Sequence, residues 1–382
     1  MRHIELLQKL IKFKSVTPLD DGCIEFLKEL LQSLNFECHI VEFHEEGFES
    51  VKNLYARLGK NGKNFCFAGH IDVVPSGKES AWIADPFSGI NINEIIYGRG
   101  AVDMKGAIAA FIEAIQRNIE NGIISDGNSI SLLITADEEG IAINGIKKMI
   151  PWLKNKNEKI DVCVIGEPTS NIHVGDVIKI GARGSINITI EVLGKQGHVA
   201  YHHLAENPIN KLADIIKELE LIKFDEGNIY FEPSNLEFTN LFVENEAVNM
   251  IPRSAIARCN IRFGNMHTAE GLSKTIEDIC RKYTENFNLE WHSSGEAFIT
   301  DYEGLAPIVS EAIKEVTGID AQINTLGGTS DARFLTEYCS TVELGLLNST
   351  AHQINESVSL RDMEILINIY VKILSKYFID SA

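Results

Sequence analysis

Two histidines and three acidic residues follow apolar runs of the sequence, at points where a strand would give way to a loop. They are His70, Asp103, Glu139, Glu167 and His352. Each has an ordinary explanation when it is taken singly. His70 could belong to a solvated turn, Asp103 could be a helix N-cap, and a lone histidine is more often structural than a ligand.

Together these five residues indicate a different chemistry. In an open α/β sheet the carboxyl ends of the strands share one crevice, and ligands bind there. Imidazole and carboxylate ligands without cysteine suit zinc, cobalt or manganese at a catalytic site. Five ligands for two ions leave open coordination positions and require one bridging carboxylate. That layout is typical of a two-metal hydrolase.

Two further acidic residues stand beside these candidates. Asp72 lies two residues after His70, so in extended backbone both side chains point to the same side. A metal-binding histidine usually gives its other N–H to a carboxylate, and Asp72 is placed to accept it. Glu138 precedes Glu139, and adjacent glutamates can divide their roles. One binds metal, while the other accepts a proton from water.

The first 178 residues alternate short apolar runs with helical patterns. Buried strands are expected at Asn64–Gly69, Ser129–Ala136 and Lys159–Ile165, and a helix at Met104–Ile119. Strand–helix alternation with nearly continuous apolar strands predicts an α/β domain with a mostly parallel sheet.

From about residue 180 the pattern changes. Apolar and polar residues now alternate strictly, which is typical of a strand with one buried face. The expected order of elements is β-α-β-β-α-β, the split βαβ or ferredoxin-like arrangement. The expected elements are Ser185–Val192, Asn207–Leu221, Leu236–Val243, Ala255–Phe263, Thr268–Asn286 and Leu289–Ser293. The helical patterns Gly304–Thr317 and Glu356–Phe378 then flank the apolar strand Ser340–Leu346. We therefore expect a small α+β domain, 180–292, inserted into an α/β catalytic domain formed by 1–179 and 293–382.

Composition narrows the classes of function. Of 382 residues, 45% are hydrophobic and 23% are charged, which excludes wholesale disorder. The formal net charge of -19 argues against nucleic acid or an anionic membrane as a partner. Seven irregularly spaced cysteines without a CxxC pair indicate a reducing compartment. With no signal-peptide pattern and no apolar stretch of about 20 residues, we expect a cytoplasmic protein.

At this point the sequence resembles a known family. The runs GHIDVVP, GRGAVDMKG, DEEG, GEPT and AHQINE occur in the order seen in the M20 family of co-catalytic zinc peptidases and deacylases. Three more runs, GKQGHVAYHHLAENPI, NMIPRSAIARCNIR and GGTSDARF, narrow the resemblance. They match the members that hydrolyse the succinyl amide of N-succinyl-L,L-2,6-diaminopimelate. The match extends from the first predicted helix to the last.

The resemblance implies a zinc-hydrolase catalytic domain with two Zn²⁺ per subunit, with Co²⁺ or Mn²⁺ as substitutes at one site. It assigns one ion to His70, Asp103 and Glu167, and the other to Asp103, Glu139 and His352, so that Asp103 bridges.

The catalytic roles also follow from the resemblance. Glu138 is the general base that takes a proton from zinc-activated water, and Asp72 supports His70. A non-proline cis peptide bond follows the residue that matches Asp103. The products are succinate and L,L-diaminopimelate, on the route to lysine and peptidoglycan.

The inserted domain resembles the family's dimerisation lid, which implies a homodimer. In it, His198 matches a residue that crosses from the partner subunit to stabilise the oxyanion. Two arginines and several polar residues match positions that hold the carboxylates of a small anionic substrate, since arginine pairs bidentately with carboxylates. These residues are Arg183, Asn249, Arg262, Thr329 and Ser330.

Three positions depart from the usual pattern, and several alternatives remain. His202-His203 replaces a proline after Tyr201, and Ala297 and Ala332 replace proline and glycine. Acetylornithine deacetylase, aminoacylase and a Glu-specific carboxypeptidase share the metal set, although the arginines favour a dicarboxylic acyl group. A non-catalytic binding protein of the same fold would be expected to have lost Glu138 or a ligand. A dinucleotide-dependent oxidoreductase would need fingerprint glycines that are missing here.

Overall fold

The computed structural model describes residues 2–124, 127–301 and 303–379 and divides into two compact units. The larger unit comprises Met1–Ile180, Thr300–Asn324 and Ser330–Ala382, and the smaller one Gly181–Ile299 and Thr325–Thr329. The boundary expected at 292/293 therefore differs from the end of the smaller unit at Ile299. The reason is that two late strands, Phe287–Gly295 and Phe298–Ile299, pair with strands of the smaller unit.

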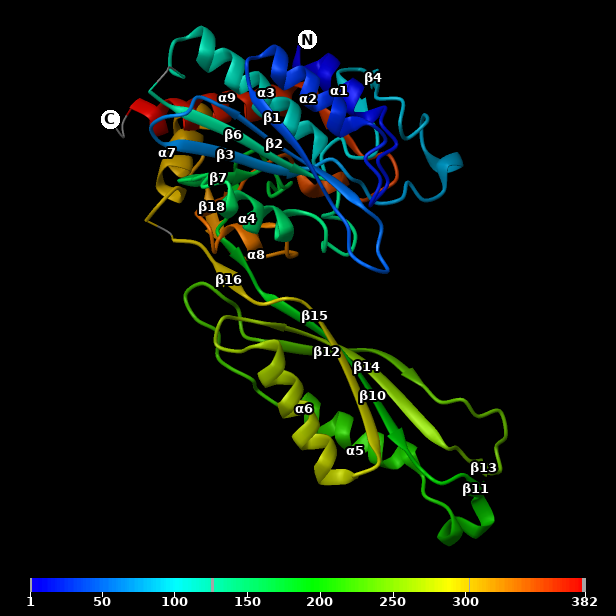
Figure 1. Ribbon diagram of the computed structural model, residues 1–382. Coiled ribbons are helices and arrows are strands. Elements are labelled where there is room, and N and C mark those ends of the chain that lie inside the picture. The colour runs from blue at the N-terminus through cyan, green and yellow to red at the C-terminus, as the bar shows by residue number, and fades with distance from the viewer. Residues whose placement is uncertain (1, 125–126, 302, 380–382) are drawn as a thin grey trace. The chain divides into compact units, whose positions relative to one another are not determined.

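The larger unit is built on an eight-stranded sheet with the order β1-β2-β6-β3-β7-β18-β8-β17 (Figure 1). The strands are β1 (Glu37–Phe43), β2 (Val51–Leu58), β3 (Asn64–His70), β6 (Ser129–Thr135), β7 (Val162–Ile165), β8 (Val177–Lys179), β17 (Gln322–Asn324) and β18 (Ser340–Glu343). The central strands β6, β3, β7 and β18 run parallel, while β1 and β2 are antiparallel at one edge. This confirms the expected α/β fold with a mostly parallel sheet.

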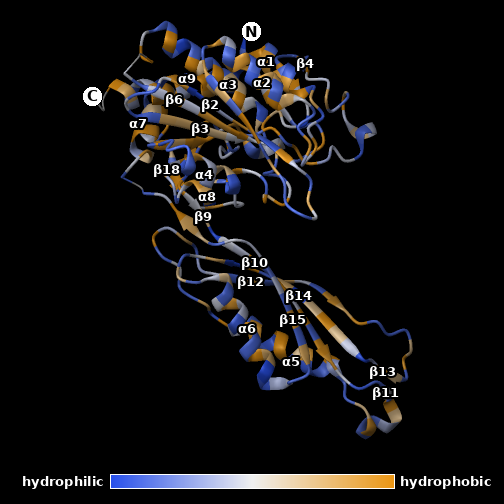
Figure 2. Ribbon diagram, in the orientation of Figure 1, coloured by the Kyte–Doolittle hydropathy of each residue, from blue (hydrophilic) through white to orange (hydrophobic). Residues whose placement is uncertain are grey.

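Helices cover this sheet because their apolar stripes need a partner. They are α1 (His3–Ile11), α2 (Cys23–Ser33), α3 (Lys105–Glu120), α4 (Ile146–Asn155), α7 (Ala306–Thr317), α8 (Ala332–Leu335) and α9 (Leu360–Ile379). Figure 1 shows α3 and α9 together on one side of the strands, with α4 and α8 on the other. Phe67 of β3 stacks on Phe111 of α3 with ring centroids 4.4 Å apart, and Tyr370 of α9 meets the same ring edge-on. The hydrophobic colour of β3 in Figure 2 marks this core.

One expected helix begins later than predicted. The pattern placed its start at Glu356, but Ser357–Ser359 forms strand β19, and α9 begins at Leu360. Strand β19 pairs with β5 (Ile95–Tyr97), which pairs in turn with β4 (Ile90–Ile92). Val358 is buried between two half-exposed serines, a strand alternation too short to recognise in the sequence. The pairing brings the segment after His352 next to the segment before Asp103.

The smaller unit has the β-α-β-β-α-β order that the sequence predicted. Its main elements are β10 (Gly184–Leu193), α5 (Pro208–Glu220), β12 (Asn235–Phe242), β14 (Ser254–Phe263), α6 (Ala269–Tyr283) and β15 (Phe287–Gly295). The sheet order is β12-β14-β10-β15 with every neighbour antiparallel, which is the split βαβ topology. Alternate residues of β10 and β14 are buried in a core with α5 and α6. Side-chain caps start both helices, from Asn207 for α5 and Thr268 for α6.

Short elements complete the described chain. In the smaller unit β11 (Gly197–His198) pairs with β13 (Met250–Ile251), and β9 (Gly181–Ala182) pairs with β16 (Phe298–Ile299). The 3-10 segments are η1 (Glu79–Ala81), η2 (Val199–Leu204) and η3 (Asn348–Thr350). None of the helices in the described ranges combines the length and apolar character that a membrane span requires.

Candidate metal centre

The carboxyl ends of three neighbouring parallel strands carry four of the predicted side chains. His70 is the last residue of β3, Glu138 and Glu139 follow β6, and Glu167 comes two residues after β7. Since β6, β3 and β7 are adjacent, these side chains emerge at the same edge of the sheet. This is the crevice in which open α/β sheets bind ligands.

Asp103 and His352 reach this edge from two loops and complete the cluster. Asp103 Oδ1 lies 3.3 Å from His70 Nε2, while Asp103 Oδ2 lies 3.0 Å from His352 Nε2. Glu167 Oε1 is 3.8 Å from His70 Nε2, and Glu139 Oε1 is 2.8 Å from His352 Nε2. Each oxygen of Asp103 therefore faces a different imidazole. The structure brings together all five residues that the sequence selected.

The donor atoms fit divalent cations. Two sets of ligand atoms lie within 4.8 Å of one another, His70 with Glu138 and Glu167, and His70 with Asp103 and Glu139. In the described chain, His70 Nε2 and Asp103 Oδ1 are buried without a hydrogen-bond partner. Buried polar atoms without partners are costly, and a metal ion would satisfy both. Nitrogen and oxygen donors of this kind suit a catalytic two-metal site.

Asp72 holds the His70 ring and the Glu138–Glu139 loop, partly through other atoms than expected. The Nδ1 atom of His70 is 2.9 Å from the backbone carbonyl oxygen of Asp72, so this carbonyl can accept the ring N–H. The carboxylate of Asp72 lies 3.7 Å from the same nitrogen. It accepts the backbone N–H groups of Glu138 and Glu139, at 3.1 and 3.0 Å. Asp72 thus holds the imidazole through its backbone and the glutamate loop through its side chain.

Burial and crowded charge shift the acid–base properties of the cluster. Burial, reinforced by the charge of Asp103, raises the pKa of Glu167 to about 8. Burial and the charge of Glu167 raise the pKa of Glu138 well above its usual value. Hydrogen bonds to Asp103 and Glu139 raise the pKa of His352 to about 10. The excess of carboxylates over imidazoles is the charge pattern that bound cations would neutralise.

The backbone around Asp103 and His352 is unusual. The Asp103–Met104 peptide bond is cis, as the resemblance implied, and His352 has a φ of 60°. Two residues of the quoted motifs, Arg99 and Glu356, form a buried ion pair beside this loop, and sequence reasoning gave them no role. The sequence does hint at them, because Arg99 lies in the run GRGAVDMKG and Glu356 in the run AHQINE, which also contain the candidate ligands Asp103 and His352.

Ser330 lies in the larger unit and is committed to a buried partner. Its hydroxyl donates to Glu343 Oε1 at 2.5 Å, and the other oxygen of Glu343 is 2.7 Å from Lys179 Nζ. Only 3% of Ser330 and 1% of Glu343 are exposed. The hydroxyl expected to bind substrate also accepts the N–H of Ala332, the buried first residue of α8, at 3.1 Å.

The other residues predicted to bind substrate lie in the smaller unit. Arg183 donates to Asn235 Oδ1 at 3.1 Å, and Arg262 is the register partner of Asn235 in the β12–β14 pairing. The two arginines therefore flank one asparagine at the start of β12. Thr329 belongs to the same unit.

His198 and Asn249 lie on neighbouring segments of this unit. The imidazole of His198 is exposed, and its Nδ1 accepts the N–H of Ala200. The N–H of Val199 donates to the carbonyl oxygen of Asn249 at 3.1 Å. His202 and His203, which depart from the usual pattern, lie exposed in η2 with their rings 6.0 Å apart.

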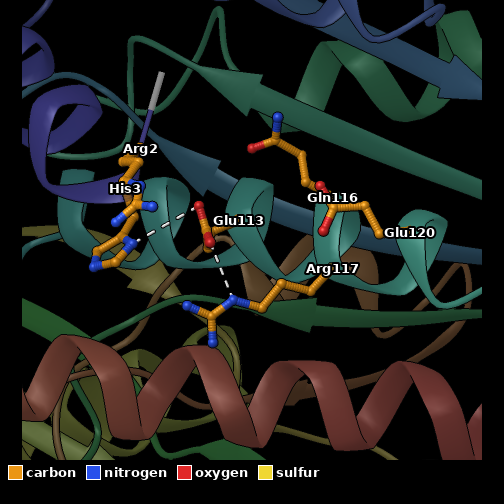
Figure 3. Close-up of a pocket in the computed structure, with 6 residues that line it drawn as sticks. All are labelled: Arg2, His3, Glu113, Gln116, Arg117 and Glu120. Carbon is orange, nitrogen blue, oxygen red and sulfur yellow. Dashed lines mark hydrogen bonds and ion pairs between the residues drawn. The ribbon is translucent and has the colours of Figure 1, made fainter.

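A separate hollow of about 420 Å³ lies between the start of α1 and helix α3 (Figure 3). Two of its basic side chains lie close to a carboxylate, since His3 Nδ1 is 3.7 Å and Arg117 Nε 3.0 Å from oxygens of Glu113. Arg117 also forms two hydrogen bonds to Glu364 of α9. Paired charges of this kind indicate a structural contact between helices rather than a second reaction site.

Comparison with known proteins agrees with this geometry. Residues 66–376 match peptidase family M20/M25/M40. The succinyl-diaminopimelate desuccinylase of Ehrlichia canis (strain Jake) is 48% identical over 376 residues, which cover 98% of either chain. The enzyme of the same name from Pelagibacter ubique (strain HTCC1062) is 46% identical over 380 residues, covering 98% of this chain and 99% of that one.

Solved structures share the fold at much lower identity. The M20 family metallo-carboxypeptidase Sso-CP2 from Sulfolobus solfataricus superimposes with a TM-score of 0.78 at 19% identity, covering 99% of this chain and all of that one. The Bacillus subtilis YXEP protein, described as a dinuclear metal binding peptidase from the M20 family, gives 0.68 at 13% identity, with 98% and 97% covered. By the extent of these matches and the order of its motifs, the chain belongs to the M20 peptidase family.

Proposed function

We propose that this chain hydrolyses the succinyl amide of N-succinyl-L,L-2,6-diaminopimelate to succinate and L,L-diaminopimelate. The observation that carries the proposal is the position of Asp103, with one carboxylate oxygen toward each imidazole and Glu138 in the same cluster. Relatives that share nearly half of their residues over nearly the whole chain are named for this activity.

Two Zn²⁺ ions are the proposed cofactors, with Co²⁺ or Mn²⁺ as substitutes at one site. His70, Asp103 and Glu167 would hold one ion, and Asp103, Glu139 and His352 the other. When bound, such ions act as Lewis acids that polarise an amide carbonyl and lower the pKa of water. The support is the donor set, which contains only imidazole nitrogen and carboxylate oxygen.

Glu138 is the proposed general base. Burial and the neighbouring charge of Glu167 raise the pKa of Glu138 in the metal-free cluster. Bound cations would lower it again, so that the ionised carboxylate could accept a proton from water. It then gives that proton to the amide nitrogen, because the nitrogen leaves readily as a neutral amine and poorly as an anion. The carboxylate of Asp72 accepts the N–H groups of Glu138 and Glu139 and so fixes the backbone that carries the proposed base.

The smaller unit supplies the proposed substrate specificity. Arg183 and Arg262 flank Asn235 and present guanidinium groups suited to bidentate pairing with carboxylates. Asn249 and Thr329 of the smaller unit, with Ser330 of the larger one, would add polar contacts to the same ligand. His198 would donate to the oxygen that becomes negative in the transition state, and its exposure leaves the imidazole available for that role.

We further propose a homodimer formed through the smaller unit. Its edge strand β12 ends in Leu241 and Phe242, which are 64% and 54% exposed. An edge strand with exposed apolar side chains is suited to pairing with another chain. The cytoplasm is the proposed location, since all seven cysteines are free thiols and disulfides are rare there.

The test is amine release from N-succinyl-L,L-diaminopimelate by zinc-loaded protein, with a chelated sample beside it. N-acetylornithine is the second substrate, because acetylornithine deacetylase shares the metal set and differs in the acyl group. Turnover that is specific for the succinyl substrate and is lost with the chelator is the expected result. Cleavage of acetylornithine alone would leave the metal centre intact and reject the proposed role of the arginines.

A further inference from the structure

An ion pair between Arg99 and Glu356 lies beside the loop that carries Asp103. Arg99 Nη1 is 2.7 Å from Glu356 Oε2, and the side chains are 3% and 0% exposed. A charge buried this completely is stable only if its partners satisfy nearly all of its hydrogen-bonding capacity. The hydrogen bonds of Arg99 and Glu356 therefore show which segments the ion pair stabilises.

The carboxylate of Glu356 accepts three backbone N–H groups of the Asp103 loop. Its Oε1 atom accepts from Val102 at 3.0 Å and from Asp103 itself at 3.2 Å. Its Oε2 atom accepts from Gly100 at 3.0 Å as well as from Arg99. Both oxygens are thus occupied by the loop, and Glu356 is no metal ligand.

The guanidinium of Arg99 holds two other segments. Its Nη1 donates to the carbonyl oxygen of Gln353 at 3.2 Å, and Nη2 is 3.4 Å from the carbonyl oxygen of His352. Nη2 also donates to the carbonyl oxygen of Pro75 at 3.3 Å. Pro75 follows closely on His70 and Asp72. The pair therefore connects the two loops that carry the proposed ligands Asp103 and His352 with the loop that follows the proposed ligand His70 at the end of β3.

These loops need such a device because they lie outside the main sheet. The N–H groups of Gly100, Val102 and Asp103 would be buried without acceptors if Glu356 were absent. His352 and Asn355 have φ values of 60° and 64°, a left-handed conformation that costs free energy for most L-residues, although Asn and His tolerate it better than others. The bonds of Arg99 to this segment help to offset that cost.

We propose that Arg99 and Glu356 are positioning residues of the metal centre, which fix the orientation of Asp103 and His352 toward the two cations. The pair carries no net charge, so it orders a strongly acidic cluster without adding to the repulsion within it. The inference rests on the proposed function, because it assigns these residues to the two-metal hydrolase described above.

The test compares Glu356→Gln with Glu364→Gln, a control at a more exposed arginine–glutamate pair. The glutamine at 356 keeps the shape, but its NH₂ must face N–H donors in either orientation. Glu364 also pairs with an arginine of the larger unit, since Arg117 Nη1 and Nη2 lie 2.7 and 3.1 Å from its two oxygens. Figure 3 shows Arg117 on α3, with its other partner Glu113. The control therefore removes an arginine–glutamate pair outside the metal centre.

We expect Glu356→Gln to weaken Zn²⁺ binding by ~10–100-fold in competition with a chromophoric chelator, as loss of outer-sphere support does. The visible absorption bands of the Co²⁺-loaded protein should also change, because they report ligand geometry. At saturating metal, kcat should fall while KM changes little. Glu364→Gln should match the wild type in all three measurements.

A folded Glu356→Gln protein with wild-type metal affinity, Co²⁺ spectrum and kcat would overturn the inference. If that variant does not fold, Arg99→Lys decides by the same measurements, because lysine keeps the charge and cannot reach three carbonyl groups at once. The wild type separates this inference from the proposed function. A wild-type protein that binds no metal or hydrolyses no succinyl amide rejects the proposed function, whereas a normal wild type with unaffected variants rejects only the positioning role.

Discussion

Asp103 is the residue with the strongest constraints in the site. Both of its oxygens face imidazole nitrogens, its N–H is held by Glu356, and a cis peptide bond follows it. Burial alone would raise the pKa of Asp103, but the imidazoles of His352 and His70 beside its two carboxylate oxygens keep that pKa below the usual range. The carboxylate is therefore ionised at neutral pH, as a bridging ligand must be.

Glu138 tests the assignment of the chemistry. In Glu138→Gln the amide has almost the same shape but takes up no proton, so turnover should fall by ~10²–10⁴-fold or more. Zinc content, measured by mass spectrometry of the metal, should stay at the wild-type level because Glu138 is not assigned as a ligand. Glu120→Gln, an exposed substitution at the end of α3, is the control. Normal turnover in Glu138→Gln would reject the assignment.

Metal binding should release protons. In the metal-free protein the pKa of His352 is raised to about 10 by its bonds to Asp103 and Glu139, and that of Glu167 to about 8 by burial. Both groups therefore carry protons at neutral pH and must lose them to bind metal. Zn²⁺ affinity should rise as pH increases through the neutral range.

Calorimetry in buffers of different ionisation enthalpy measures this proton release directly. His352→Ala should release fewer protons than the wild type, while Glu120→Gln should release the same number. Binding enthalpies that do not depend on the buffer would contradict the expected linkage.

At the scale of the elements, the position of the proposed ligands at strand ends could be predicted, whereas the contacts that support them could not. His70 and Glu167 follow uninterrupted apolar runs, and such runs predict buried parallel strands whose ends meet. Arg99 and Glu356 act through backbone groups of distant loops, and no periodicity records such contacts. The start of α9 was misplaced for the same reason, since β19 exists only by pairing with β5.

The close approach of β7 to α3 should be sensitive to a single methyl group. A Cβ at Gly166 would lie 2.6 Å from atoms of Ala107, Met104 and Phe67. Gly166→Ala should therefore destabilise the fold by ~1–3 kcal/mol, the usual cost of overpacking. It should also lower kcat, because Glu167 directly follows Gly166 and Asp103 directly precedes Met104, whose side chain would be displaced.

Urea unfolding and steady-state kinetics measure these two effects. Gly127→Ala is the matched control, since a Cβ there meets nothing within 4 Å. Should Gly166→Ala unfold at the same urea concentration as the wild type, the tight packing at this point would be disproved.

At the scale of the whole molecule, the proposed active-site residues are divided between two compact units. The proposed metal ligands lie in the larger one, whereas His198, Arg183 and Arg262 lie in the smaller one. The sequence predicted this insertion from a change in periodicity near residue 180, because a two-residue alternation signals a sheet with one covered face. The proposed contact with a second subunit could not be predicted in this way, because the residues of a surface patch do not recur at a regular spacing in the sequence.

The proposed role of His198 in the partner subunit gives a prediction for mixed dimers. Glu138→Gln and His198→Ala should each be nearly inactive alone, the latter with a larger loss in kcat than in substrate affinity. In a mixed dimer, the His198→Ala subunit keeps Glu138 and receives His198 from its partner, so one centre is complete. Random exchange makes half of the dimers mixed, so about a quarter of wild-type activity should return. Mixing Glu138→Gln with His352→Ala is the control, because each variant then damages the metal centre of its own subunit. A heterodimer verified by native mass spectrometry that stays inactive would place His198 outside the partner's reaction.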